Sequence, residues 1–407
     1  MVEDSKSARR RWLRFSLRTL LLGCVVLAAG LGWLGNILAR VRHERQIVAR
    51  VKAAGAKVRY DYQLENEKVG DRYQAKSPPG PWLLRRLFGD DVFARVVAVD
   101  CSQPSVTDAD IARFDELPGL AHLLLSGEGI SDRGIATIAR VRRLRSLCLS
   151  STHVTATGLA QLAGKQSLES LTLAGSSVTD DVLSQLHRFQ SLAELQIVRT
   201  EVTSAGLAPV GQLRQLRELD LFDNVRIGND GLKYLTSLTN LEKLNVWRSR
   251  ITDDGLYQLR PRLRLRKLTL SECPVSDAGM GHVATLQHVT MLDLRNTNVG
   301  DSGVRDLESL VNLEQLSLSF TPLTDEGAAR LARFPNLRRL DLSDTKLTNR
   351  SLETLKSLTK LQWLTLSPDV TPEAAATLRP YLPSARIIGF STTGPRYHID
   401  SAGNVVQ

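Results

Sequence analysis

The stretch LTDEGAARLARFPNLRRLDLSDTK, residues Leu323 to Lys346, decides the fold because it is one copy of a unit that recurs along most of the chain. A second copy, ITDDGLYQLRPRLRLRKLTLSECP, runs from Ile251 to Pro274. Both contain an apolar residue, Thr-Asp-x-Gly, an apolar helical face and Leu-x-x-Leu-x-Leu. Most units are 24 residues long, a period typical of arrays whose stacked repeats bury a shared core. The units begin at Val106, Ile130, Val154, Val178, Val202, Ile227, Ile251, Val275, Val299, Leu323, Leu347 and Val370.

The Leu-x-Leu of each unit predicts a short strand. In Leu219-Asp220-Leu221 and Leu340-Asp341-Leu342 the leucines point inward and the middle residue points outward, because side chains alternate between the faces of a strand. Stacked units place these strands side by side in a parallel sheet. We therefore expect an α/β solenoid with the sheet on its concave face and helices on its convex face.

The Thr-Asp-x-Gly element predicts the start of each convex helix. A threonine can cap free backbone N–H groups, and an aspartate suits the positive end of the helix dipole. Leu256 and Leu259 then form the face that packs on the sheet. The expected caps are Thr252, Thr324 and Thr348, and the aspartates are Asp253, Asp277 and Asp325.

A second recurring position lies just beyond each strand and holds small side chains that form hydrogen bonds. We expect these side chains to satisfy buried backbone groups in the turn, which have no partner in the sheet. They are Thr152, Thr200, Asn224, Cys273, Thr297, Thr321 and Thr345.

The ends of the array differ from its interior, as terminal repeats must cover an apolar end. Residues 81–105 are expected to form an N-terminal cap, with the helix WLLRRLFG and the first strand VVAVDCS. The repeats and a C-terminal cap span 106–390, where Ala385, Ile388 and Phe390 match the strand positions of other units. Residues 391–407 are expected to form a polar tail.

The positive charge of the chain is confined to its N-terminal region. Residues 1–60 contain 13 lysines and arginines and three acidic residues, which accounts for the whole net charge of +10. The repeats are therefore neutral, which argues against nucleic-acid binding. Residues 1–18 form a basic segment, residues 19–39 are apolar and long enough for a transmembrane helix, and residues 40–80 predict a juxtamembrane helix and a linker.

Residues 19–39 could also belong to a cleaved signal peptide, since RRRWLR at Arg9 to Arg14 loosely resembles a twin-arginine export signal. A membrane anchor is favoured because no small-x-small cleavage site follows. The basic residues on the two sides number six and seven and do not decide the orientation. We expect a single-pass protein of the cell membrane, with its repeats on the non-cytoplasmic side.

Sequence motifs of catalysis are missing. The chain has no H-E-x-x-H, G-x-S-x-G, phosphate-binding or dinucleotide-binding motif, and its four cysteines form no C-x-x-C or Cys/His cluster. His122 is expected on the concave face without a nucleophilic or acidic partner. These observations predict a protein that is not an enzyme and that has no cofactor and no metal site.

We call the same position in successive units a column. The most distinctive column is the first residue after each Leu-x-Leu, which also faces outward. Three successive units have apolar residues there, and strands about 4.8 Å apart should join them into one stripe. Exposed aromatic residues on a rigid scaffold are candidates for partner binding. The alternative is that they pack on one another and bind nothing. The candidate site comprises Val198, Phe222 and Trp247 with the surrounding Glu194, Glu218, Asp220, Asn245 and Arg295.

LRRLDLSDTKLT, at Leu337 to Thr348, resembles the short leucine-rich repeats of the cysteine-containing and GALA types, whose fold is similar to ribonuclease inhibitor. With RWLRFSLRTLLL, VRYDYQ and PPGPWLLRRLFGDDVF before the repeats, the layout also resembles bacterial membrane-anchored leucine-rich-repeat proteins. The resemblance is specific for the fold and does not name a partner. We expect a non-catalytic, membrane-anchored module that binds a protein or peptide on its concave face. A structural spacer of the cell envelope is the alternative. Adaptors of ubiquitin ligases also contain such repeats, but they have an adaptor box where this chain has an apolar segment.

Overall fold

The computed structural model describes residues 17–64, 67–69, 72–74, 78–103, 105–259, 264–389 and 396–406. The chain divides into two compact units, which are described separately. Unit 1 comprises Met1–Arg50 and Arg59–Val96, and unit 2 comprises Val51–Val58 and Val97–Gln407.

Unit 1 is dominated by α1 (Leu17–Ala53), a continuous helix over the segments expected as membrane helix and juxtamembrane helix. Its length and apolar composition would allow it to cross a membrane, and a signal sequence would have the same properties. The remaining elements show that part of the expected linker forms short strands. They are α2 (Asp61–Leu64), the antiparallel pair β2 (Glu67–Val69) and β3 (Arg72–Gln74), α3 (Trp82–Phe88) and the 3-10 helix η1 (Asp90–Val92). β1 (Lys57–Tyr60), whose first two residues belong to unit 2, is the first strand of the long sheet.

The expected helix in residues 81–105 is present as α3, which begins after Pro81 and ends at Gly89. None of its residues is buried. The expected first strand is present as β4 (Val96–Cys101), which pairs in parallel with the strand of the next repeat.

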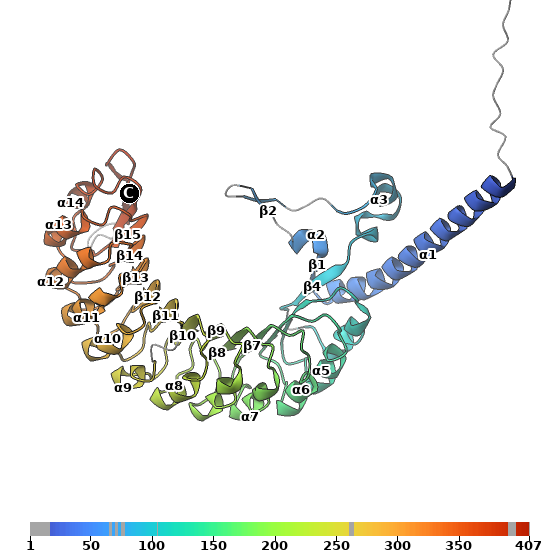
Figure 1. Ribbon diagram of the computed structural model, residues 1–407, viewed down its shortest axis with the longest axis horizontal. Coiled ribbons are helices and arrows are strands. Elements are labelled where there is room, and N and C mark those ends of the chain that lie inside the picture. The colour runs from blue at the N-terminus through green and yellow to red at the C-terminus, as the bar shows by residue number, and fades with distance from the viewer. Residues whose placement is uncertain are drawn as a thin grey trace, which may run out of the picture. The chain divides into compact units, whose positions relative to one another are not determined.

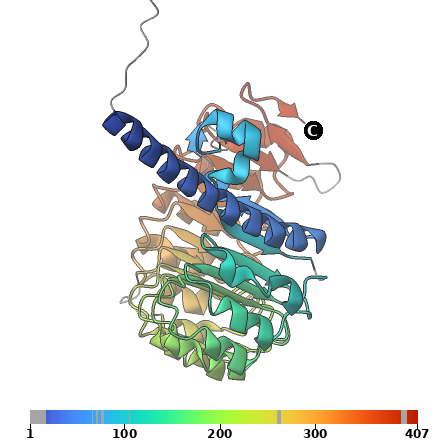
Figure 2. The same cartoon turned by 90° about the vertical axis from the view of Figure 1, so that its right-hand side faces the viewer.

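Unit 2 is a solenoid of stacked repeats, each of which contributes one parallel strand (Figures 1 and 2). The strands follow one another in the sheet in sequence order, so each repeat pairs only with its neighbours. After β4 they are β5 (His122–Ser126), β6 (Ser146–Ser150), β7 (Ser170–Ala174), β8 (Glu194–Val198), β9 (Glu218–Asp220), β10 (Lys243–Asn245), β11 (Lys267–Thr269), β12 (Met291–Asp293), β13 (Gln315–Ser317), β14 (Arg339–Asp341), β15 (Trp363–Leu366) and β16 (Arg386–Gly389).

The strands line the concave face of unit 2, and short helical segments form its convex face (Figure 1). The α-helices are α4 (Asp108–Ile111), α5 (Asp132–Ile138), α6 (Ala156–Gln161), α7 (Asp180–Leu183), α8 (Asn229–Leu235), α9 (Asp253–Leu256), α10 (Asp277–Val283), α11 (Asp301–Asp306), α12 (Asp325–Ala328), α13 (Leu352–Leu355) and α14 (Pro372–Ala376). The 3-10 helices are η2 (Phe114–Glu116), η3 (Leu186–Arg188), η4 (Ala205–Leu207), η5 (Val210–Gln212), η6 (Leu307–Ser309), η7 (Ala329–Arg333) and η8 (Asn349–Ser351).

The core lies between the sheet and the convex segments and is built from the predicted leucines. Leu219, Leu244 and Leu268 are paired across β9, β10 and β11, and each is at most 2% exposed. Leu256 and Leu259 pack from the convex side and are equally buried. The alternation of inward leucines and outward residues is confirmed.

The turn after each strand depends on two adjacent columns. The first column has its backbone in the left-handed region, which most residue types other than glycine, asparagine and aspartate avoid. It contains Gly127, Gly175 and eight other residues with φ between 52° and 58°: Ser151, Arg199, Asp223, Arg248, Glu272, Asn296, Phe320 and Asp344. The second is the predicted column of small side chains, and its role is confirmed for Thr200, Asn224, Cys273, Thr297, Thr321 and Thr345. Thr297 and Thr321, for example, donate hydrogen bonds of 2.7 and 2.6 Å to the carbonyls of Leu294 and Leu318, the residues directly after β12 and β13.

The aspartate column connects neighbouring repeats. Asp301 accepts hydrogen bonds from the backbone N of Thr324 (2.8 Å) and from its Oγ1 (2.6 Å), one repeat further along the chain. Interpreting these aspartates only through the helix dipole is therefore incomplete. The same contact explains why glycine recurs at this position of the motif, since a Cβ on Gly327 would lie 2.3 Å from Asp301 Oδ1. The aspartates and asparagines that contact the next repeat are Asp108, Asp132, Asp180, Asn229, Asp253, Asp277, Asp301, Asp325 and Asn349.

The helix caps agree with the prediction in two of three cases. Thr324 and Thr348 accept hydrogen bonds from backbone N–H groups two residues ahead, at 3.2 and 3.3 Å. The prediction for Thr252 is wrong, because its side chain caps no backbone group and instead accepts a 2.8 Å hydrogen bond from Asn229 Nδ2. An asparagine in place of the usual aspartate supplies a donor, which changes the role of the hydroxyl.

The C-terminal end of unit 2 is more ordered than a polar tail. β17 (Tyr397–Ile399) pairs antiparallel with β16 and with β18 (Val405–Val406). Tyr397 is 2% exposed, and its hydroxyl donates a 3.0 Å hydrogen bond to the carbonyl of Val370. The prediction missed this hairpin because only Tyr397 and Ile399 alternate as buried residues among polar ones. Residues 391–395 lie outside the described residues.

The expected register of the last repeat is wrong by one residue. Ile387, and not Ile388, pairs with Leu364, which in turn pairs with Leu340. Ile387 lies as far from the start of its unit at Val370 as Leu364 lies from Leu347, so the error came from matching the apolar Ala385, Ile388 and Phe390 to the leucine pattern. Phe390, expected at another strand position, lies outside the described residues.

Candidate functional site

The candidate site is on the concave face of unit 2, at the ends of β8, β9 and β10. Val198 ends β8, while Phe222 and Trp247 lie two residues beyond β9 and β10, and all three are half-buried. The rings of Phe222 and Trp247 are stacked, with centroids 4.2 Å apart and planes inclined by 12°. Parallel strands in register bring these two side chains face to face.

Two arginines and an aspartate border this aromatic pair. Arg199 lies over the Phe222 ring with its guanidinium carbon 5.5 Å from the centroid, and Arg248 lies 5.9 Å from the Trp247 centroid. The Asp223 carboxylate is between the arginines, 3.4 Å from Arg199 Nε and 3.2 Å from Arg248 Nη1. We define the aromatic patch as Phe222, Trp247, Arg199, Asp223 and Arg248.

Sequence reasoning missed the three charged members of the aromatic patch. Each directly follows a residue of the column that contains Val198, Phe222 and Trp247, so alternation assigned it to the buried face. The left-handed turn turns it back to the surface, with φ of 52° for Arg199 and 58° for Asp223. The signal that could have found them is the glycine at the same position of two other repeats, Gly127 and Gly175.

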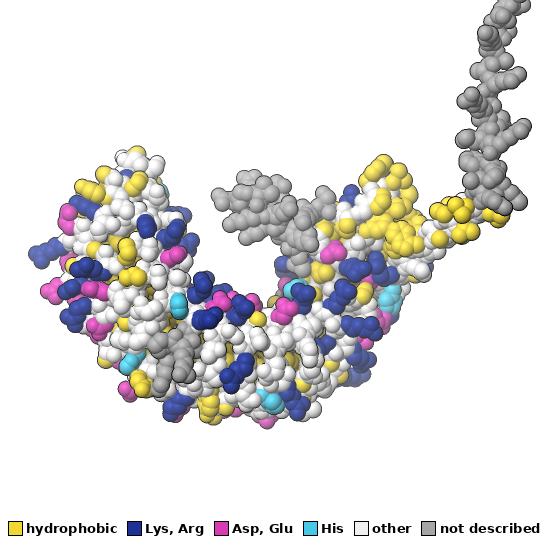
Figure 3. Space-filling model, viewed as in Figure 1, with side chains coloured by type: hydrophobic (Ala, Val, Ile, Leu, Met, Phe, Trp, Pro, Cys, Tyr) yellow, Lys and Arg dark blue, Asp and Glu magenta, His cyan; other side chains and the backbone are white. Residues whose placement is uncertain are grey.

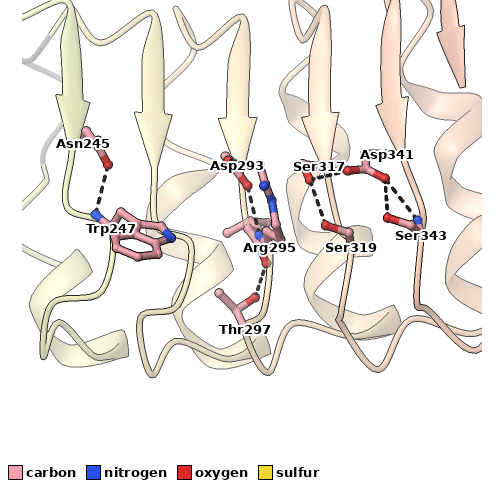
Figure 4. A network of polar contacts seen from close by, with 10 residues as sticks. Asn245, Trp247, Asp293, Arg295, Thr297, Ser317, Ser319, Asp341 and Ser343 are labelled. Atoms are coloured by element: carbon pink, nitrogen blue, oxygen red, sulfur yellow. Dashed lines mark hydrogen bonds and ion pairs between the residues drawn. The ribbon is translucent and has the colours of Figure 1, made fainter. Parts of the chain in front are cut away.

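The predicted polar residues Asp220 and Asn245 accept hydrogen bonds from the backbone of Phe222 and Trp247. Asp220 Oδ1 accepts hydrogen bonds of 2.9 Å from the backbone N of Phe222 and from Asn245 Nδ2. Asn245 Oδ1 accepts a 3.0 Å hydrogen bond from the backbone N of Trp247 (Figure 4). Burial raises the pKa of Asp220, although these hydrogen bonds oppose the shift. Both residues therefore position the rings.

Glu194 and Glu218 line a shallow hollow next to the aromatic patch. Its volume is about 160 Å³, and Asp220, Lys243 and Asn245 also line it. Glu218 forms an ion pair with Lys243 across β9 and β10. The hollow thus presents carboxylates and amides beside the stacked rings, a combination suited to polar groups of a peptide.

Arg295 lies apart from the aromatic patch. It forms a 3.1 Å ion pair with Asp293 of β12, and Ser271 occupies the intervening position of its column (Figure 4). Both charged residues line a different hollow of about 310 Å³, which also includes Asp341 and Trp363. The structure therefore groups Arg295 with the C-terminal repeats.

A network of serines and Asp341 borders this second hollow. Asp341 accepts a 2.7 Å hydrogen bond from the Ser343 hydroxyl, and Ser317 is 3.5 Å from both Asp341 and Ser319 (Figure 4). Trp363 Nε1 donates a 3.1 Å hydrogen bond to a threonine hydroxyl of its own strand. These contacts satisfy the polar groups internally and leave the aromatic patch as the better candidate.

Phe320 is a further surface residue that sequence reasoning missed. It is 56% exposed and has a φ of 56°, a conformation that is unfavourable for a bulky residue. Other repeats have Gly, Ser, Asp, Asn, Arg or Glu at this position, so Phe320 is its one aromatic residue among the described repeats. Strain of this kind is often kept at functional sites.

The geometry offers no arrangement for catalysis in the described residues. His122 is exposed at the first position of β5, as expected. Within the described part of the chain, no group of three or more His, Cys, Asp or Glu side chains is placed to hold a metal ion. Burial raises the pKa of the Cys101 thiol to about 12, so this thiol is a poor nucleophile at neutral pH.

Comparisons with known proteins agree with this fold. Leucine-rich-repeat models match residues 212–235, 285–307, 309–332 and 336–358. No curated protein sequence matches the chain. The crystal structure of an internalin from Listeria monocytogenes is similar in fold, with a TM-score of 0.53 and 20% sequence identity, over 74% of this chain and 87% of the internalin chain.

These matches indicate no enzymatic family, and repeats of this kind are typical of protein–protein interaction modules. Together with the strand register and the recurring core, they identify the repeats of unit 2 as leucine-rich repeats in a solenoid of the α/β class.

Proposed function

We propose that this chain is a non-catalytic, membrane-anchored interaction module that binds a protein or peptide on its concave face. The aromatic patch would supply the central contacts, with Glu194, Glu218, Asp220 and Asn245 as its polar border. The anchor would be α1, as in the bacterial membrane-anchored repeat proteins that the sequence resembles, and the repeats would lie on the non-cytoplasmic side.

The observation that carries this proposal is the stack of Phe222 on Trp247, bordered by Arg199 and Arg248. Stacked rings on a rigid sheet lose little conformational entropy when a partner binds, and tryptophan and arginine are the residues most enriched in binding hot spots. A spacer of the cell envelope would be better served by a uniformly polar concave surface.

The test is chemical cross-linking in intact cells, followed by mass spectrometry of the proteins attached to the full chain. Replacing Phe222 and Trp247 together by Ala should lower the recovery of the specific partner at least about tenfold, since hot-spot residues typically contribute 2 kcal/mol or more. The matched control replaces Tyr234 and Tyr257 by Ala, which removes two exposed aromatic residues from the convex side. Equal recovery from both variants would refute the concave site and favour the spacer.

The membrane arrangement is tested separately. Protease added outside intact cells should digest unit 2 if the repeats are on the non-cytoplasmic side, and extraction at alkaline pH should leave the full chain in the membrane fraction. Release at alkaline pH would refute the anchor without affecting the concave site.

A further inference from the structure

Helix α3 of unit 1 presents apolar side chains that nothing in the described structure covers. Trp82, Leu83 and Leu87 are 62%, 52% and 66% exposed, and α3 has no buried residue. Leu83 and Leu87 are four residues apart, so they lie on the same side of the helix. Arg86, also exposed, accompanies them. α3 is therefore a short helix with an unpartnered face of tryptophan and leucine beside basic charge.

The segment that contains α3 is held against α1 at two points. Arg45 Nε donates a 2.8 Å hydrogen bond to Asp91 Oδ2, and Arg45 also donates to the carbonyl of Phe88, the last residue of α3. Nearer the N-terminus of α1, the Trp33 ring stacks on Phe93 with centroids 6.4 Å apart. α3 thus belongs to the part of unit 1 that packs on α1 between positions 33 and 45.

The Trp33–Phe93 contact lies where the exposed apolar part of α1 ends. Every side chain from Leu21 to Trp33 is exposed, whereas Val41, Glu44 and Ile47 are buried. Figure 3 shows hydrophobic side chains over both α3 and the N-terminal part of α1. The two exposed apolar regions of unit 1 are therefore joined by the Trp33–Phe93 contact.

We propose that α3 is a second membrane contact, lying in the bilayer interface beside the point where α1 leaves the membrane. This inference rests on the proposed anchoring by α1. Tryptophan favours the level of the lipid headgroups, leucines reach into the acyl region and arginines bind lipid phosphates. A second protein surface would also cover apolar residues, but the continuity with the proposed span and the adjacent basic charge favour lipid.

The test measures the depth of single fluorescent labels on the full chain in vesicles of phosphatidylcholine and phosphatidylglycerol. Cys24 and Cys148 are replaced by Ala, while Cys101 and Cys273 remain because both are buried and burial raises their thiol pKa values. An environment-sensitive dye is then attached at Leu87→Cys, and lipids carry a nitroxide at the shallow or the deep end of the acyl chain. Leu83→Cys provides a second reading of the same helix face.

Two further labels serve as references. Val26→Cys reports on α1, and Val311→Cys reports on an exposed position of the repeats. The shallow nitroxide should quench the Leu87 and Leu83 labels about twofold more strongly than the deep one, since interfacial helices bury their apolar face only 5–10 Å. The deep nitroxide should quench the Val26 label, and neither should quench the Val311 label.

Other outcomes separate the two hypotheses. If the Val26 label is quenched and the α3 labels are not, the interfacial contact is refuted while the anchor stands. If none of the labels is quenched, the anchor itself is refuted. Labels on α3 that are shielded from water but are quenched by neither nitroxide would mean that protein, and not lipid, covers this face.

Discussion

Phe222 and Trp247 stack with ring centroids 4.2 Å apart, although 25 positions separate them in the sequence. Each ring extends from the turn after its strand, and the parallel register of β9 and β10 brings the two turns together. The pair therefore packs the turns after β9 and β10 against each other as well as forming the proposed binding surface.

A double-mutant cycle should reveal this contribution. Phe222→Ala, Trp247→Ala and the double variant should give a coupling energy of about 0.5–1.5 kcal/mol, as for other aromatic pairs. The measurement is urea unfolding of the detergent-solubilised full chain. As a control, Phe222→Ala combined with Trp363→Ala should be additive within about 0.5 kcal/mol because those residues are several strands apart. Equal coupling in both pairs would contradict a direct ring contact.

Asp301 should contribute to stability through its two hydrogen bonds to Thr324. Asp301→Ala leaves the Thr324 N–H and hydroxyl without this acceptor and should cost about 1–3 kcal/mol of unfolding free energy. Asp301→Asn should cost less, since asparagine keeps one acceptor and occurs naturally at Asn229 and Asn349. If the two variants unfold at the same urea concentration, the carboxylate is not acting as an acceptor across the repeats.

Gly327 should not tolerate even a methyl group. A Cβ there would lie 2.3 Å from Asp301 Oδ1 and 2.5 Å from Leu323 Cδ1, so Gly327→Ala should destabilise the protein by about 1–3 kcal/mol. The matched control is Gly281→Ala in α10, where a Cβ would have nothing within 4 Å. That variant should be as stable as the parent or more stable, because alanine favours the helix. Thermal unfolding of both variants measures the difference.

Phe320 should weaken the fold because of its left-handed backbone. Phe320→Asn, the residue type at the equivalent Asn296, should raise the unfolding free energy by about 1 kcal/mol, the order of the strain for a residue in that region. Lower stability of this variant would show that the exposed ring makes contacts that exceed the strain. Cross-linking of the same variant then tells whether Phe320 also takes part in partner binding.

Asp220 should make stability depend on pH. Its pKa is raised by burial, so the folded protein holds this proton more tightly than the unfolded chain does. Stability should therefore fall as the pH rises through and above the range of a solvated aspartate, near pH 4. Asp220→Asn keeps a side-chain acceptor without the charge. The unfolding free energy of this variant, relative to that of the parent, should therefore be higher at pH 7 than at pH 4. If urea unfolding gives the same difference in unfolding free energy between variant and parent at both pH values, the raised pKa is refuted.

Much of the fold could be predicted because the period assigns most positions to one face. The buried leucines, the threonine column and the placement of Phe222 and Trp247 on the concave side all follow from alternation within a unit. The errors lie where the repeat pattern weakens. In the divergent last unit, matching apolar residues to the leucine pattern chose Ile388 in place of Ile387, and the β17 hairpin has no counterpart in other repeats.

The sequence predicted where the candidate site lies but not all of the residues that form it. The sequence indicated an apolar stripe, but it did not indicate that Arg199, Asp223 and Arg248 surround the rings. A left-handed residue reverses the direction of the chain, so alternation no longer tells which way the side chain points. Arg295, assigned to the same site by its column, instead pairs with Asp293 near the C-terminal repeats.

The sequence by itself determined the repeat length, the residues that enter the core and the apolar character of α1, because these depend on local periodicity and composition. Tertiary structure alone decided the partners of the side chains one repeat away: Asp301 with Thr324, Phe222 with Trp247 and Asp223 with two arginines. The physical reason is that parallel pairing in register brings residues some 24 positions apart to within hydrogen-bond and ring-stacking distance. No contact within a single repeat specifies those partners.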